Sequence, residues 1–110
     1  MKFAKVFPLL IAKAERKGRT QDEVFEVTKW LLGYTKEELE AMLESEATYG
    51  NFIDNAPMKN PSRMKIKGRI CGIKVEEIEE PRMRDLRILD KLVDELAKGK
   101  DLNMIINLWQ

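Results

Sequence analysis

The second half of the chain holds the side chains with the most chemical potential, and Cys71 is the first of them. It is the one cysteine in the sequence. A thiol becomes reactive when nearby positive charge lowers its pKa, and Lys67, Arg69 and Lys74 are close in sequence. The chain has no histidine, however, so neither a Cys-His nor a Ser-His nucleophile pair can form. We therefore expect Cys71 to act as a small buried apolar side chain.

An acidic cluster follows this cysteine. Its members are Glu76, Glu77, Glu79 and Glu80. Carboxylates are ligands that Mg²⁺ and Ca²⁺ prefer, but this spacing matches no EF-hand loop and lacks the glycine of that loop. With one cysteine and no histidine, a structural zinc site within one chain is excluded as well. We expect a solvated acidic face, with no metal, no cofactor and no catalytic residue.

A basic stretch lies just before the acidic cluster. From Asn55 to Val75 the chain carries no acidic residue. If this stretch is a helix, Arg63, Lys67 and Lys74 fall within about 40° of one another. These three, with Lys59 and Arg69, are the candidate anion-binding residues. The stretch has no aromatic side chain, so stacking on single-stranded bases is not indicated.

Composition narrows the classes of function. The 110 residues suit a single domain, and a formal net charge of +1 creates no global attraction to nucleic acid or anionic membranes. One cysteine makes no internal disulfide, so we expect a cytoplasmic setting. The apolar run near the N-terminus is short and interrupted by Pro8, which is not typical of a signal peptide. No run approaches the roughly 20 apolar residues of a membrane span.

Helical periodicity is the main structural signal. Apolar residues recur at helical spacing from Phe3 to Ala14, and again from Tyr49 to Ala56. Between them, Thr20 with Glu23 and Thr35 with Glu38 form two capping boxes, each of which starts a helix. Gly33 separates these two helices.

This helix–turn–helix pair invites a DNA-binding interpretation. Its second helix, however, carries glutamates at 37, 38, 40, 44 and 46 against the single basic residue Lys36. Phosphate would repel these carboxylates, so a plain helical hairpin is the better interpretation.

The strongest predicted helix runs from Pro81 to Lys98. Proline suits the first helical position, and Gly99 suits the end. Its apolar stripe is Met83, Leu86, Leu89, Val93 and Leu96. A last predicted helix carries a second apolar stripe, which consists of Leu102, Ile105, Ile106 and Trp109. We expect this C-terminal stripe to dock onto a helix face, in its own chain or in a second copy.

Residues 62–78 are open to two interpretations. As a helix, Ile66, Ile70 and Ile73 align, but Gly68 and Gly72 each cost about 1 kcal/mol. As strands, basic and apolar residues alternate with a period of two, yet no other segment offers a clear pairing partner. A helix followed by an irregular connection is the favoured interpretation, and a short hairpin is the alternative.

Four stretches of the sequence resemble a known family. They are KAERKGRT at 13–20, WLLGY at 30–34, NPSR at 60–63 and the long run ICGIKVEEIEEPRMRDLRILDKLVDELAKGK at 70–100. Together they make the chain similar to the small bacterial proteins of domain of unknown function 2200. The resemblance implies a small orthogonal helical bundle in a bacterial cytoplasm, and it implies no catalytic residue.

These observations predict one all-α domain over residues 1–110, an orthogonal bundle of five to seven helices. They favour a non-enzymatic protein that works by binding another protein or a second copy of itself. Binding of nucleic acid or a phosphate anion through residues 59–74 is the alternative. An enzyme that uses Cys71 or the carboxylates at 76–80 is a third class, disfavoured because no converging catalytic groups are visible.

Overall fold

The computed structural model describes residues 1–70 and 72–109, and for residues 107–109 it describes the backbone alone. Cys71 and the side chain of Trp109, both singled out above, lie outside the described residues.

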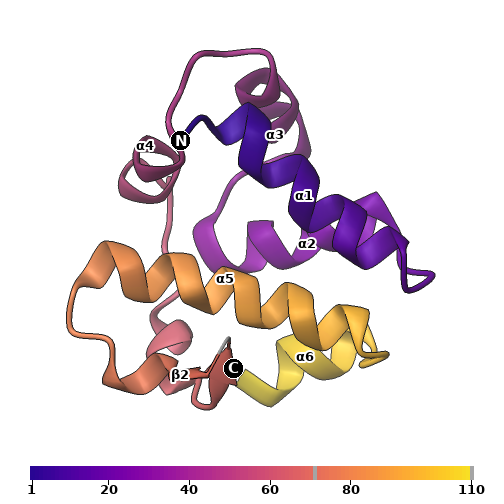
Figure 1. Ribbon diagram of the computed structural model, residues 1–110, viewed down its shortest axis with the longest axis vertical. Coiled ribbons are helices and arrows are strands. Elements are labelled where there is room, and N and C mark those ends of the chain that lie inside the picture. The colour runs from indigo at the N-terminus through magenta and orange to yellow at the C-terminus, as the bar shows by residue number, and fades with distance from the viewer. Residues whose placement is uncertain (71, 110) are drawn as a thin grey trace.

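Six α-helices form within the described part of the chain and make up a small bundle (Figure 1). They are α1 (Phe3–Glu15), α2 (Gln21–Leu32), α3 (Lys36–Leu43), α4 (Tyr49–Asp54), α5 (Pro81–Ala97) and α6 (Leu102–Trp109). Between α4 and α5 lie two 3-10 turns, η1 (Pro61–Lys65) and η2 (Val75–Glu77), and two short strands, β1 (Arg69–Ile70) and β2 (Ile73–Lys74). The predicted all-α fold is confirmed. The helices are not all parallel. In Figure 1, α5 runs across the view, whereas α4 is seen nearly end-on.

Both capping boxes are confirmed. The Thr20 hydroxyl accepts a hydrogen bond from the Glu23 amide at 3.2 Å, and the Glu23 carboxylate accepts one from the Thr20 amide at 3.0 Å. Thr35 and Glu38 repeat this exchange at 3.1 and 2.9 Å. Each pair satisfies two backbone donors that the helix itself leaves without partners.

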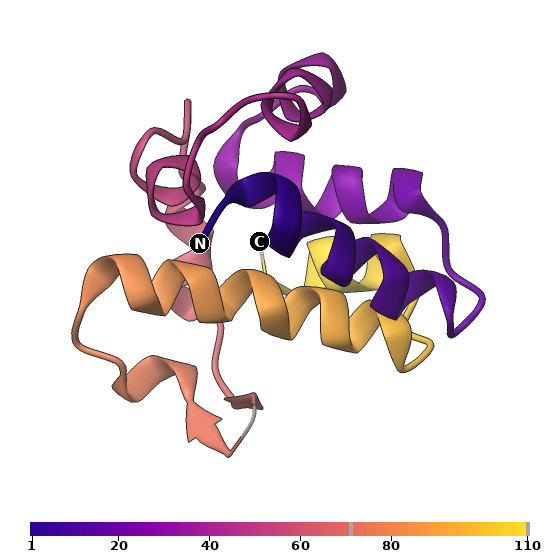
Figure 2. The ribbon, with the colours of Figure 1, turned by 45° about the horizontal axis from the view of Figure 1, so that its top comes forward.

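Helix α5 lies at the centre of the bundle. It contacts α1, α2, α4, α6 and the hairpin strand β1, so elements from both halves of the chain meet on it (Figures 1 and 2). The predicted stripe is largely buried, although Met83 is exposed. Ile88 and Leu92 are fully buried too, so the apolar face of α5 is wider than the stripe read from the sequence.

A cluster of aromatic rings joins α1 to α4. The ring of Phe3 lies 4.8 Å from that of Phe7 and 4.5 Å from that of Phe52, between centroids. Tyr34 stacks on Phe52 with a centroid separation of 5.1 Å. Its hydroxyl donates to the Phe52 carbonyl at 2.7 Å, so this buried polar group has a partner.

The helical interpretation of residues 62–78 is wrong, and the hairpin alternative is correct. Arg69 pairs with Lys74 and Ile70 with Ile73 in an antiparallel register. Gly68 and Gly72 have φ of +123° and +78°, which a right-handed helix does not contain. In this irregular path Ile66, Ile70 and Val75 all become buried.

The part of the C-terminal stripe that the structure describes packs within its own chain. Helix α6 contacts α2, α5 and η1, and Ile105 is only 1% exposed. Leu102 packs against the core, and Ile106 is half-buried. The fold therefore uses this stripe to cover its own core.

Truncation after Lys100 should lower the thermal midpoint and leave the mass in solution unchanged. Burial of side chains such as Leu102 and Ile105 contributes roughly 1.5–3 kcal/mol each. Calorimetry and light scattering measure the two quantities. Met104→Ala is the matched control in the same helix, because Met104 is 61% exposed and its loss should change stability little. A fall in mass on truncation would show instead that the segment joins two copies.

Candidate functional site

The predicted basic stretch does not form one face. The Lys59 ammonium lies 3.0 Å from Asp85 Oδ2, and the Arg63 Nε lies 2.9 Å from Asp85 Oδ1. The Asp85 side chain is only 4% exposed, so these two cations neutralise a buried carboxylate on α5. Breaking such a pair from one side typically costs about 3–5 kcal/mol. Lys59 and Arg63 therefore have a structural role in holding the segment after α4 against α5.

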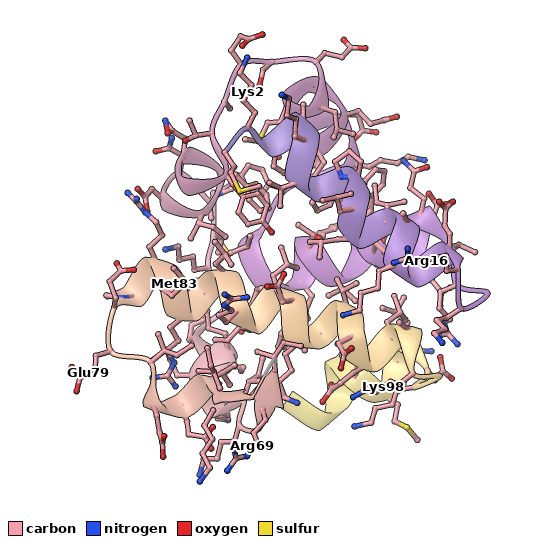
Figure 3. The ribbon with its side chains drawn as sticks, in the orientation of Figure 1. Lys2, Arg16, Arg69, Glu79, Met83 and Lys98 are labelled. Atoms are coloured by element: carbon pink, nitrogen blue, oxygen red, sulfur yellow. The ribbon has the colours of Figure 1, made fainter. Side chains whose placement is uncertain are left out.

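The rest of the stretch lies around the exposed hairpin at the edge of the molecule (Figure 3). Arg69 and Lys74 stand opposite each other across the two strands, and both are exposed. Acidic groups lie close to them. The Glu76 carboxylate accepts from the Gly68 amide at 3.1 Å, and this amide, with Lys74 and Lys67 nearby, holds the pKa of Glu76 below its usual value. The hairpin surface is thus basic with acidic neighbours.

The predicted acidic cluster does not converge either. Within residues 1–70 and 72–109, no group of three acidic or cysteine side chains is arranged to hold a metal ion. Glu80 caps α5, since its carboxylate accepts from the amides of Arg82 and Met83 at 3.1 and 2.7 Å. This places an anion at the positive end of the helix dipole.

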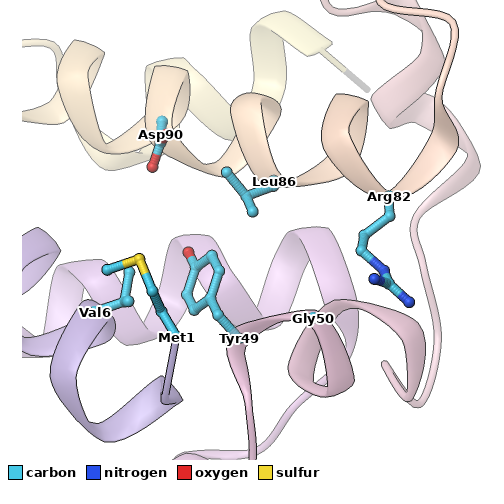
Figure 4. A pocket seen from close by; sticks show the side chains of 7 residues that line it. All are labelled: Met1, Val6, Tyr49, Gly50, Arg82, Leu86 and Asp90. Carbon is cyan, nitrogen blue, oxygen red and sulfur yellow. The ribbon is translucent and has the colours of Figure 1, made fainter.

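A pocket that the sequence did not reveal lies between α1, α4 and α5 (Figure 4). Its volume is about 300 Å³, at the lower end of the range for small-molecule sites. Its lining is mostly apolar with a few polar groups. The residues are Met1, Val6, Tyr49, Gly50, Arg82, Leu86 and Asp90.

Local structure explains why these residues meet. On α5, Arg82, Leu86 and Asp90 are four residues apart, so they share one face of the helix. The opposite wall is held by an antiparallel bridge between Lys2 and Thr48. There the Tyr49 amide donates to the Met1 carbonyl at 2.7 Å and the Phe3 amide donates to the Ala47 carbonyl at 2.9 Å.

Arg82 closes one end of the pocket. Its Nε donates to Asp54 Oδ1 at 2.9 Å, and its Nη2 contacts the other carboxylate oxygen. This pairing with Arg82 holds the pKa of Asp54 below its usual value. A Cβ at Gly50 would lie 3.3 Å from Arg82 Nη1, so glycine lets the guanidinium lie close against α4.

Tyr49 forms the floor of the pocket. It is 5% exposed, and its ring packs on Phe52 with a centroid separation of 5.3 Å. Its hydroxyl points toward α5 (Figure 4) and has no hydrogen-bond partner among the described residues. Burial raises the pKa of Tyr49, and the Asp90 charge raises it further, so the phenol stays protonated. Buried polar groups normally have partners. Single side-chain atoms of Arg19, Trp30, Arg84 and Glu95 also lack one among the described residues, but of these five residues only Tyr49 lines the pocket.

Asp90 lies at the other end. Arg87 Nη1 donates to its Oδ2 at 3.3 Å, and no other described group donates to the carboxylate. Burial raises the pKa of Asp90, while Arg87 and Lys13 act in the opposite direction. The net effect on the pKa is upward. The side chain is 22% exposed, and its other oxygen, Oδ1, remains open to solvent or to a ligand. The pocket therefore presents one donor, Tyr49, and one acceptor, Asp90.

Replacing Tyr49 with phenylalanine should leave the free energy of unfolding unchanged or raise it by up to about 1 kcal/mol, because the lost hydroxyl has no partner. Tyr34→Phe is the matched control. Its hydroxyl bonds to the Phe52 carbonyl, so its loss should cost about 1–2 kcal/mol. Urea unfolding measures both. Equal destabilisation by the two substitutions would mean that Tyr49 has a hydrogen-bond partner after all.

Comparison with known proteins places the chain among bacterial proteins. The model of the family described as "Uncharacterized protein conserved in bacteria (DUF2200)" matches residues 1–107. The crystal structure of uncharacterized protein SP1917 is similar, with 48% sequence identity and a TM-score of 0.96 over 99% of this chain and 89% of that one. Among curated proteins, no match was found. In the described part of the chain, no helix is long and apolar enough to cross a membrane.

Proposed function

The chain belongs to the bacterial family DUF2200, and we propose that it is a non-enzymatic cytoplasmic protein that binds a small molecule in the pocket between α1, α4 and α5. The family and the similar crystal structure are both described as uncharacterized. They support the fold, and the function is therefore argued from the residues of the site.

The Tyr49 hydroxyl is the observation that carries this proposal. Leaving a buried donor without a partner costs about 1–3 kcal/mol, so folded proteins usually avoid it. Here the hydroxyl points into a pocket large enough for a ligand, beside a carboxylate with spare acceptor capacity. A bound molecule that satisfies both groups would recover that free energy on binding.

The same groups favour binding over catalysis. General acid–base catalysis near neutral pH needs a group that titrates near that pH. Burial moves the pKa of Tyr49 upward, away from neutrality. The pKa of Asp90 is raised toward neutrality, but among the described residues no second carboxylate, serine, threonine or cysteine lines the pocket with it. A permanently protonated phenol and a carboxylate suit hydrogen bonding to a ligand.

Association with another protein or a second copy was expected through the C-terminal stripe. In the fold, Ile105 from that stripe is buried against the chain's own helices. Other apolar side chains open to a partner include Leu9 and Met58, which are exposed. These come from different elements, so the pocket is the better-supported binding site.

The proposal predicts that small molecules bind in the pocket and that a larger side chain introduced there prevents their binding. We would screen a mixture of small neutral and charged fragments by ligand-observed NMR. Leu86→Trp should abolish binding, because the indole occupies the pocket. Leu9→Trp is the control, since Leu9 is 64% exposed on the outer side of α1. If no fragment binds, or if fragments bind equally to the Leu86→Trp variant, the proposal is wrong.

A second candidate function, binding of phosphate-rich ligands, is favoured by the hairpin register. Arg69 and Lys74 are directly opposite each other, and like charges in that position destabilise a strand pair. A bound anion would relieve this repulsion. Lys67 is near enough to act on the pKa of Glu76, as Lys74 does, and would add to the positive surface.

Binding of a duplex or single-stranded oligonucleotide at low salt tests this candidate. The double variant Arg69→Gln and Lys74→Gln should remove most of the binding and its salt dependence, because fewer counterions are released. Arg16→Gln with Lys17→Gln is the matched control, because both are exposed and Arg16 lies far from Arg69 (Figure 3). Arg63 is unsuitable, since it holds the buried Asp85. Absence of binding by the unaltered protein at low salt would contradict the candidate.

A further inference from the structure

We infer that the pocket between α1, α4 and α5 takes a neutral molecule whose polar head carries both a hydrogen-bond donor and an acceptor, a primary amide or an alcohol, on a short apolar chain. The inference rests on the proposed function and names the chemical class of its ligand.

The Tyr49 side of the pocket requires an acceptor. Its phenol is protonated, because burial and the Asp90 charge both raise its pKa. Among the described residues nothing accepts its O–H. A ligand carbonyl or hydroxyl oxygen can accept this hydrogen bond, whereas an ammonium group has no lone pair with which to do so.

The Asp90 side requires a donor. An ionised carboxylate accepts hydrogen bonds and donates none. Arg87 bonds to Oδ2 at 3.3 Å, which leaves Oδ1 available to a ligand N–H or O–H. A ligand carboxylate has no donor to offer and would be repelled by the Asp90 charge.

The charges around Asp90 argue against a cationic head. Arg87 and Lys13 both act on this carboxylate, and Lys13 also lies 3.0 Å from Asp94 one turn further along α5. These cations oppose part of the negative charge of Asp90, and an ammonium head would also leave the Tyr49 hydroxyl without an acceptor. At the other end of the pocket, Arg82 is paired with Asp54, so its positive charge is already neutralised without an anionic ligand.

The walls between the two polar ends suit an apolar chain. Val6 from α1 and Leu86 from α5 come from opposite walls of the pocket (Figure 4). Leu86 points toward Tyr49, and Met1 lies beside Val6 and Tyr49. Methionine is flexible and can adapt to different apolar shapes. A short alkyl chain would contact these side chains while its head reaches Tyr49 and Asp90.

Four unbranched probes of five carbon atoms each test the possible head groups. They are pentanamide, n-pentanol, pentylammonium and pentanoate, each titrated into the protein at neutral pH with Kd read from amide NMR shifts. Pentanamide and n-pentanol should bind about tenfold more tightly than either charged probe, which is the fold-change expected for one hydrogen bond. Shifts should centre on Tyr49, Leu86 and Asp90.

Variants then test each hydrogen bond separately. Tyr49→Phe and Asp90→Asn should each weaken pentanamide roughly five- to tenfold. Asp90→Asn should also strengthen pentanoate, because the asparagine offers a donor and removes the repelling charge. Glu26→Gln is a charge control on the exposed side of α2 and should change no Kd.

The outcomes distinguish the two proposals. Tightest binding by pentylammonium or pentanoate, with shifts in the pocket, would overturn the inference and leave the pocket as a binding site. Equal binding of all four probes would overturn it too, because the polar groups would then play no part. If none of the four binds and the fragment screen also finds nothing, the proposed function itself fails.

Discussion

Burial of helix α5 is the constraint on which the rest of the fold depends. Its fully buried residues, such as Ile88, Leu92 and Leu96, cover a face too wide for one neighbour, so α1, α2, α4 and α6 all pack on it. The same helix takes Asp85 into the interior, and a buried carboxylate needs charged partners. Lys59 and Arg63 supply them, and in doing so they bring the irregular segment after α4 onto α5.

The elements that could be predicted are those with local signals. Thr20 and Thr35 begin their helices because a side chain and a backbone amide three residues away satisfy each other. Pro81 and Gly99 bracket the predicted α5 for similarly local reasons, and α5 itself ends at Ala97. Helical spacing also placed Leu89, Val93 and Leu96 in the core correctly, because burial on a helix repeats with the turn.

Residues 62–78 and the pocket depend on contacts between distant parts of the chain. A Cβ at Gly68 would lie 2.9 Å from the end of Lys91 on α5, and the Gly68 amide is held by Glu76 eight residues later. Neither contact can be recognised from the spacing of apolar residues, so periodicity does not decide between strand and helix in this segment. The pocket combines Met1, Tyr49 and Asp90, which the sequence keeps far apart. The sequence gives one local indication of the pocket. Arg82 and Asp90 each lie four residues from Leu86, so one helix face carries an apolar residue between two charged ones.

The polar groups of the pocket contrast with their counterparts in the core. Tyr34 and Tyr49 both pack on Phe52, yet the Tyr34 hydroxyl bonds to a backbone carbonyl and the Tyr49 hydroxyl bonds to no described group. Asp85 and Asp90 both lie on α5, yet Asp85 has two close cations and Asp90 one long contact at 3.3 Å. Stability alone would favour a phenylalanine at position 49. A buried hydroxyl without a partner and a carboxylate with an open oxygen face the same 300 Å³ pocket, which is consistent with a site whose hydrogen bonds are completed by a bound molecule.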